Sequence, residues 1–379
     1  MALARSIRLG LSVLVASAGL AASAHAFPIV YDPPDVDRWN YLFAATPGDR
    51  PTAPVFGAFA TAGQFDERDG QMLLIFDTFP EIPAGRPPSA YSILSAKVVL
   101  DRSPTNSWVY DSTYDGYRTY LALENPSDPQ ALADTDAGRP MELYGVGYRL
   151  AGLDATTYDE NGTAFGPAGL VARTRYAYPN DNLASPTLFG DRDVSNNVLD
   201  RFDPTAFAVG IVPGATPGTT ISGAGTVEMN LSLTPSVRAY LQNRLAQGSV
   251  DLMVTSLEPA AQGGAAVYPV FLQKESGTGA ATLEIDVVVK PSCNDGVDND
   301  GDSLVDYPAD PGCFAKGDDT EVEDCRDGVD NDGDGKIDYP ADPQCKSATG
   351  AREKPAGCGL LGVEPLLVLG WFARRKRAR

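Results

Sequence analysis

The chain has 379 residues, enough for two or three domains, and its 50 acidic against 30 basic residues give a formal net charge of −20. A chain this acidic repels nucleic acid and attracts cations, so nucleic acid is excluded as a partner. The only histidine is His25, close to the N-terminus.

Residues 1–26 have the pattern of a secretory signal peptide. A basic start at Arg5 and Arg8 precedes an apolar run, and Ala24-His25-Ala26 supplies the small residues that signal peptidase requires. We therefore expect export, with a mature chain that begins near Phe27. Loss of His25 would leave no imidazole, which excludes a Ser–His nucleophile and a histidine-ligated metal.

Residues 27–290 are rich in glycine, proline and aromatic residues and predict an antiparallel β-sandwich, jelly-roll-like in architecture. Alternating or β-branched runs predict its strands. These predicted strands cover residues 71–79, 93–100, 141–150, 206–212, 227–233, 251–256, 267–273 and 283–289. Residues 101–205 are less regular, and we expect either strands with long loops or an insertion.

One helix is expected after the strand at 227–233. Thr234 can cap it, Pro235 suits its first turn, and Gly248 can end it. Val237, Tyr240, Leu241 and Leu245 share one face, so the helix should cross between strands over one end of the sandwich.

Two passages of this domain resemble a DNRLRE-type carbohydrate-binding jelly roll. Phe76-Asp77-Thr78 and the runs at 82–85 and 95–100 look like its opening, and residues 227–289 are similar to its close. The resemblance contains no catalytic motif and leaves out the central part of the domain, between these two passages. It implies a glycan-binding fold.

An aromatic group near residue 110 is the predicted ligand-binding patch. Trp108, Tyr110, Tyr114 and Tyr117 lie close to one another in the sequence and to two aspartates. Aromatic faces stack on sugar rings, so a polysaccharide or matrix glycan is the candidate ligand. The alternative, which we favour, is that the tyrosine spacing marks a buried helix face.

Residues 293–345 contain an internal repeat, in which the segment 293–313 recurs as the segment 325–345. The two copies agree at 16 of 21 positions, so one structural requirement is met twice. Each copy carries aspartates at alternate positions, and calcium takes six to eight oxygen ligands of this kind. The predicted calcium ligands are Asp298, Asp300, Asp302, Asp306 and Asp310 in the first repeat and Asp330, Asp332, Asp334, Asp338 and Asp342 in the second.

The loops depart from the EF-hand pattern. The glutamate expected at position twelve is replaced by Ala309 and Ala341, and no flanking helices are evident. These loops resemble thrombospondin type 3-like repeats, which implies structural calcium held by the matching aspartates. Ser303 replaces the turn glycine that Gly335 supplies, so the first site is expected to be the weaker one. A solvated acidic linker that binds cations diffusely is the alternative.

Four cysteines bracket the repeats and are disulfide candidates in an exported chain. The simplest of three pairings joins Cys293 to Cys313 and Cys325 to Cys345. After a linker at 346–357, residues 358–379 combine Cys358, a short apolar run and terminal arginines. This tail resembles MYXO-CTERM and PEP-CTERM sorting signals, which implies cleavage and lipid attachment near Cys358. An uncut membrane anchor is the alternative.

The expected function is that of a protein at the cell surface or outer envelope, or released from it. Its sandwich would be displayed on a calcium-stabilised stalk and would bind glycan or matrix. A purely structural envelope protein explains the same features. A carboxylate-dependent glycan-active enzyme is a weaker alternative, because no Gly-x-Ser-x-Gly or phosphate loop is present. We therefore do not expect an enzyme.

Overall fold

The computed structural model describes residues 28–41, 44, 46–58, 69–148, 160, 177–182, 194, 204–260 and 267–353. The predicted signal at 1–26 and the predicted sorting tail with Cys358 lie outside these residues.

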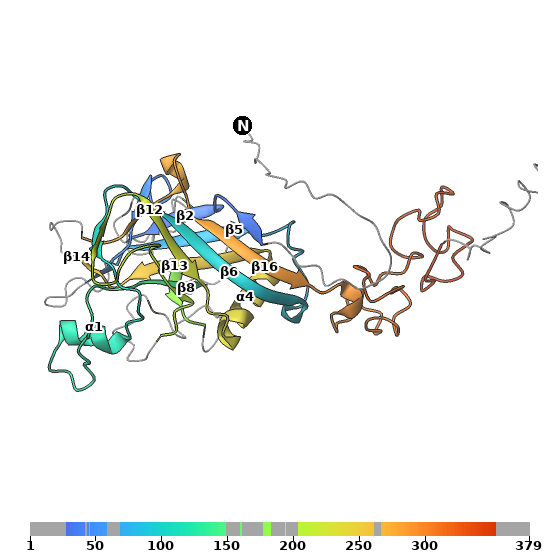
Figure 1. Cartoon of the computed structure of the whole chain (residues 1–379). Coiled ribbons are helices and arrows are strands. Elements are labelled where there is room, and N and C mark those ends of the chain that lie inside the picture. The colour runs from blue at the N-terminus through green and yellow to red at the C-terminus, as the bar shows by residue number, and fades with distance from the viewer. Residues whose placement is uncertain are drawn as a thin grey trace, which may run out of the picture.

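The first of two large sheets is built around the long strand β6 (Tyr91–Arg102). Its six strands run in the order β1–β16–β6–β15–β3, with β12 also paired to β6. Strands β16, β6 and β12 are labelled in Figure 1. All of these pairings are antiparallel. The other strands are β1 (Ile29–Tyr31), β16 (Thr282–Val289), β15 (Val270–Leu272), β3 (Thr52–Pro54) and β12 (Gly225–Asn230).

The second sheet also has six strands, in the order β10–β8–β13–β5–β2 with β9 paired to β8. These are antiparallel pairings as well. The strands are β10 (Ala208–Val209), β8 (Met141–Tyr148), β13 (Ser249–Ser256), β5 (Gln71–Asp77), β2 (Val36–Asn40) and β9 (Ala177–Asn180). Two small pairs accompany the sheets: β7 (Ser107–Val109) with β11 (Thr220–Ser222), and β4 (Gly57–Ala58) with β14 (Pro259–Ala260), the latter parallel.

One hydrophobic core joins the two large sheets. Alternate residues of β6, among them Val98 and Leu100, pack in the same cluster as Leu74 and Phe76 of β5. The opposite face of β5 is buried too, because Leu73 belongs to a second apolar cluster. Burial on both faces explains why β5 is a continuous apolar run while β6 alternates. The predicted mainly β, antiparallel fold is confirmed, in a sandwich-like arrangement.

Helix α4 (Pro235–Gln247) connects β12 of the first sheet to β13 of the second. The Thr234 side chain accepts a hydrogen bond from the Val237 N–H, and Gly248 ends the helix with φ of 87°. The four residues of the predicted face are buried against the core. The predicted capped crossover helix is therefore confirmed.

Three 3₁₀ turns and one further helix complete the described elements. They are η1 (Pro88–Ala90), η2 (Lys274–Ser276), η3 (Ser292–Asn294) and α1 (Tyr117–Glu124). Each of the eight predicted strands overlaps an observed strand, although β10 and β15 are shorter than expected.

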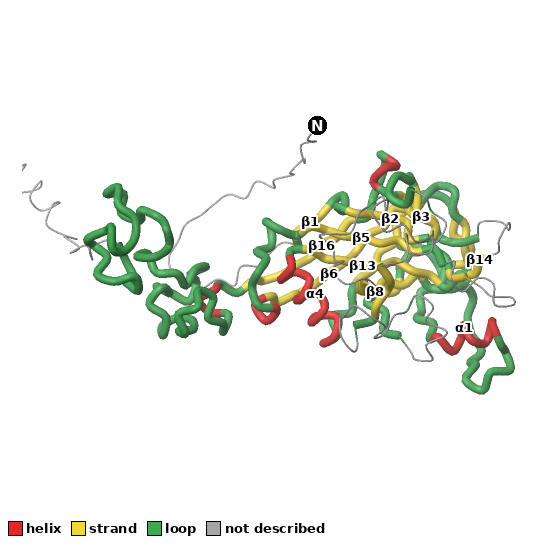
Figure 2. Tube along the Cα trace, turned by 180° about the vertical axis from the view of Figure 1, so that it is seen from behind, coloured by secondary structure: helices red, strands yellow, loops and turns green. Residues whose placement is uncertain are grey.

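The repeats follow β16 through η3 and extend away from one end of the sheets (Figures 1 and 2). From residue 295 to residue 353 the chain forms turns and bends without helix or strand. The side chain of Arg86 connects this segment to the β domain through hydrogen bonds and an ion pair. Its guanidinium donates to the Lys290 carbonyl at 3.2 Å and to the Ser292 hydroxyl at 2.8 Å, and it pairs with Asp319 at 3.1 Å.

Candidate metal centre

Each repeat is closed by its own disulfide bond. Cys293 is joined to Cys313 and Cys325 to Cys345, each across a separation of 20 residues. The simplest of the three predicted pairings is therefore the observed one. In small units with almost no apolar core, such cross-links replace part of the missing hydrophobic stabilisation.

The aspartates at 298, 300 and 302 form the tight loop of the first repeat. Asp298 accepts the Gly301 N–H at 2.6 Å through one oxygen and the Ser303 N–H at 2.8 Å through the other. Asp300 accepts the Asp302 N–H at 3.1 Å. One carboxylate oxygen from each of the three aspartates lies within 4.8 Å of the other two.

The second repeat reproduces this loop. Asp330 accepts the Gly333 N–H at 2.7 Å and the Gly335 N–H at 2.8 Å. Asp332 accepts the Asp334 N–H at 3.0 Å. The 1-3-5 spacing therefore folds the backbone around its own carboxylates in both repeats, with an oxygen of the second and third aspartates left for another donor or a cation.

Asp310 and Asp342, two of the predicted ligands, are buried carboxylates with one oxygen that lacks a partner in the residues the structure describes. Each is 1% exposed, and each uses Oδ1 to accept the N–H two residues later at 2.7 Å. The Oδ2 atom of each is buried without a hydrogen-bond partner in the described part of the chain. Burial raises the pKa of Asp310, and the charges of Asp300, Asp302 and Glu323 raise it further. Asp310 therefore lies close enough to these carboxylates for their charges to act on it.

Glu323 is a further carboxylate of the first site that the sequence analysis missed. It is fully buried, and its Oε1 has no hydrogen-bond partner among the described residues. Its Oε2 accepts from Nε of Arg326, whose Nη2 donates to Asp300. One guanidinium from the second repeat thus lies among the carboxylates of the first.

In the second repeat an amide occupies the corresponding place. Gln344 Nε2 donates to Asp332 Oδ2 at 2.7 Å and to Asp334 Oδ2 at 3.2 Å. The hydrogen bond from Gln344 lowers the pKa of the Asp334 carboxyl. Both loops therefore converge on a position that favours a positively charged or donating group.

Two further glutamates, which the sequence analysis also missed, bind the backbone of the loops, one glutamate for each repeat. Glu321 accepts the Asn299 N–H at 2.6 Å and the Asp306 N–H at 3.1 Å. Glu353 does the same for residues 331 and 338, at 2.6 and 2.8 Å. The spacing from Glu321 to Glu353 equals that from the first cysteine of one repeat to the first cysteine of the next, and this coincidence could have revealed them.

Asp306 and Asp338, which are also predicted ligands, bind backbone N–H groups as Asp298 and Asp330 do. Their carboxylates accept the N–H groups of Gly296 at 3.1 Å and Gly328 at 2.9 Å, at the start of each repeat. Both residues have φ of 53°, in the left-handed region. Asp338 Oδ1 is in addition buried without a hydrogen-bond partner among the described residues, as is one oxygen each of Asp310 and Asp342.

The predicted aromatic patch is mostly internal. Trp108, Tyr110 and Tyr117 are 1%, 2% and 6% exposed, and Trp108 and Tyr110 belong to the main core. Tyr114 is 38% exposed, and its hydroxyl donates to the Pro204 carbonyl. Of the four, only Tyr117 lies in a helix, so the tyrosine spacing does not mark one helix face.

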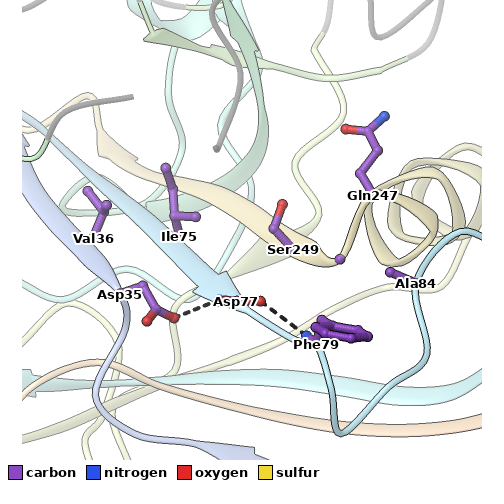
Figure 3. A pocket seen from close by; sticks show the side chains of 9 residues that line it. Asp35, Val36, Ile75, Asp77, Phe79, Ala84, Gln247 and Ser249 are labelled. Carbon is purple, nitrogen blue, oxygen red and sulfur yellow. Dashed lines mark hydrogen bonds between the residues drawn. The ribbon is translucent and has the colours of Figure 1, made fainter. Parts of the chain in front are cut away.

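A hollow of about 590 Å³ lies where β2, β5 and the end of α4 meet (Figure 3). Asp35 accepts the Asp77 N–H at 2.7 Å, and Asp77 accepts the Phe79 N–H at 3.1 Å. Phe79 is 56% exposed, and the Gln247 and Ser249 side chains also line the hollow. A second exposed ring, more exposed than that of Tyr114, therefore lies here beside carboxylates and polar side chains.

A buried carboxyl lies on β2, away from the repeats. Asp37 accepts the Lys274 N–H at 2.5 Å, and its Oδ1 has no hydrogen-bond partner among the described residues. Burial raises its pKa to about 8, the hydrogen bond from Lys274 opposes this rise, and the charges of Glu275 and Glu160 add to it. Burial thus favours the protonated, uncharged form of Asp37 in the folded protein.

Comparison of the chain with protein-family models gives no match, and comparison with curated proteins gives none either. Within the described ranges, no helix combines the length and the apolar character needed to cross a membrane.

Proposed function

We propose that this chain is an exported surface protein whose jelly-roll-like sandwich is displayed on two calcium-stabilised repeats. The observation that carries the proposal is the same buried, unpartnered carboxylate oxygen in both repeats, on Asp310 and Asp342. A buried carboxylate without a partner is unfavourable unless a cation compensates its charge.

The donor set fits calcium. The ion would be held in the first repeat by Asp298, Asp300, Asp302, Asp310 and Glu323, and in the second by Asp330, Asp332, Asp334, Asp338 and Asp342. All of these donors are hard oxygens, which calcium prefers over nitrogen or sulfur. The ion would supply charge neutralisation and cross-link each loop.

The charge balance argues against a loose acidic linker. Residues 293–345 contain 17 acidic and three basic residues. Without a counterion such a segment would favour an expanded chain. Two repeats that share the same disulfide, the same carboxylate–backbone hydrogen bonds and the same orphaned oxygen support a specific site instead.

The test is a calcium count on the whole mature chain by calorimetry and equilibrium dialysis. Asp332→Asn should remove one ion, because the substitution removes a charged ligand of the second loop while the side chain keeps nearly the same volume. Asp319→Asn is the matched control: its side chain is exposed and pairs with Arg86 outside both loops. A chain that takes up no calcium at millimolar concentration would refute the proposal.

The structural role follows from the lack of helices in the repeats. A calcium sensor needs an element that moves, whereas these loops are closed by disulfides and turn on themselves. Calcium here would stiffen a stalk. The two disulfides fit an oxidising, exported environment. Attachment to the membrane would come from the sorting tail at 358–379, with Cys358 as the lipid-bearing residue.

Glycan binding is the second part of the proposal, and the hollow beside Phe79 supports it. Sugar rings stack on exposed aromatic faces, and carboxylates and amides accept or donate to their hydroxyls. Asp77 and Gln247 would serve as these polar partners (Figure 3). A purely structural protein, without a soluble ligand, is the competing interpretation.

A glycan array separates these two interpretations. The whole chain should bind a defined polysaccharide, and Phe79→Ala should abolish that signal while Tyr114→Ala leaves it unchanged. Repeating the array with a chelator tests whether the repeats affect binding. Silence across all glycans would refute the glycan-binding part and leave the structural role.

A further inference from the structure

A second group of carboxylates lies in the β domain, at the connection from β7 to β8. Asp111 follows β7, Asp115 precedes α1, and Asp136 comes from the chain that returns to β8. One carboxylate oxygen from each lies within 4.8 Å of the other two. Gly138 fixes the return: its φ is 102°, and a Cβ there would lie 2.5 Å from the Val109 carbonyl oxygen.

Asp111 supplies the observation that points to a ligand. It is 1% exposed, and its Oδ1 accepts the N–H of Thr113 at 2.8 Å. Its Oδ2 is buried and has no hydrogen-bond partner within the described residues. The Thr113 hydroxyl lies 2.7 Å from Asp111 Oδ1 and 2.9 Å from Asp136 Oδ2. A hydroxyl has one proton, so it cannot satisfy both carboxylates at once.

The ion pairs in the described structure do not balance the negative charge of these three aspartates. Arg139 pairs with Asp115 at 2.5 Å and with Asp134 at 2.8 Å. No ion pair in the described part of the chain involves Asp111 or Asp136. Within the described residues, Asp111 and Asp136 thus have no ion-pair partner, and both ion pairs of Arg139 go to other aspartates.

The surroundings add further acid instead of relieving this excess. Burial raises the pKa of Glu142 to about 8 and that of Glu258 to about 7, and the charge of Asp111 adds to both shifts. Each of these glutamates also has a buried oxygen without a hydrogen-bond partner among the described residues. Burial and the charge of Asp111 thus disfavour ionisation of both glutamates, so the acids around the group exceed the positive charge available to them.

We propose that Asp111, Asp115 and Asp136 bind one calcium ion, separate from the ions of the repeats. Three carboxylates and no nitrogen or sulfur donor suit a hard divalent cation. Asp136 is exposed, so the group opens to solvent. An ion can enter there and keep water molecules in its remaining coordination positions. Its role would be to fix the β7–α1–β8 connection.

The test measures calcium bound to the whole mature chain by equilibrium dialysis at about 1 mM free calcium, within the range typical of extracellular modules. Asp111→Asn and Asp136→Asn should each remove one ion and weaken that site at least tenfold. Asp128→Asn is the control, because Asp128 lies in the same connection and accepts only a local N–H in the described structure. Equal ion counts in wild type, Asp136→Asn and control would overturn the proposal.

Two features keep the outcome unambiguous. Asp136 is exposed, so Asp136→Asn reports on the site even where Asp111→Asn prevents folding. Hydrogen exchange of residues 107–118 should slow on calcium addition in the wild type and remain fast in Asp136→Asn. The repeats are scored separately through Asp332→Asn, so loss of the repeat sites and loss of this site give different ion counts.

Discussion

Asp310→Asn should have opposite effects with and without calcium. In a chelator the wild-type carboxylate is buried, has one unpartnered oxygen and faces three other acids. The amide keeps an oxygen to accept the Gly312 N–H and removes the negative charge. The stability of the first repeat in chelator should therefore stay the same or rise. In calcium the variant has lost a ligand and should be the less stable protein.

The magnitude in calcium follows from linkage. An ion that binds only the folded repeat stabilises it by about 2.7 kcal/mol when its concentration is 100 times the dissociation constant. This corresponds to about a hundredfold slowing of local opening. A variant that cannot hold the ion loses the whole of this gain, whatever its stability in chelator.

Hydrogen exchange followed by mass spectrometry measures this opening directly. The reporter is the peptide 293–313, whose N–H groups at 301, 303 and 312 donate to loop carboxylates. Calcium should slow its exchange about a hundredfold in the wild type and leave Asp310→Asn unaffected. Asp342→Asn is the matched control and should lose the effect only in the second repeat. If Asp310→Asn kept the full slowing, Asp310 would not be a ligand.

Three further outcomes follow from the described residues. Ser303 has φ of 74°, a left-handed conformation that costs a non-glycine residue about 1 kcal/mol. Ser303→Gly should therefore raise the calcium affinity of the first site about fivefold, measured by calorimetry. Gly335→Ser should lower the calcium affinity of the second site. Replacing Cys325 and Cys345 by serine should destabilise the second repeat by about 3 kcal/mol, measured by exchange in the presence of calcium. The pKa of Asp37 is raised from 3.8 to about 8, so between these pH values the folded chain holds a proton that the unfolded chain releases. The free energy of unfolding should therefore fall between pH 4 and pH 8, by up to about 1.4 kcal/mol per pH unit. Asp37→Asn should flatten this slope in denaturant titrations.

Local patterns in the sequence predicted the parts of the fold that local physics determines. Helix α4 has a cap, a proline in its first turn and a terminal glycine, and all three signals act over short stretches of chain. The loop aspartates could be grouped as candidate ligands for the same reason, because their spacing and their hydrogen bonds lie within one loop. Strands β5 and β13 were found from apolar runs that are buried on both faces.

Features that depend on tertiary contacts were missed. Glu323 lies beyond the end of the first repeat, far from Asp300 in the sequence, and only the folded chain shows that both face Asp310. Arg326 follows a cysteine of the second repeat, and nothing in that position indicates that its guanidinium reaches into the first. Exposure was equally hidden, because the spacing of aromatic residues near Trp108 does not say which rings enter the core.

The arginines at the repeats explain why calcium binding and stiffness should be coupled in the proposed stalk. Arg86 joins the β domain to the first repeat, Arg326 joins the second repeat to the first, and Arg352 stacks over Phe314 with 4.4 Å between guanidinium carbon and ring centre. Glu323 links the contact between the repeats to the proposed ion, since its Oε2 accepts from Arg326 while its Oε1 remains for an ion. An ion on Oε1 would hold Glu323 in place and so hold the joint between repeats. Chelation should therefore loosen that joint as well as the loops, which is the behaviour of a stalk made rigid by its metal.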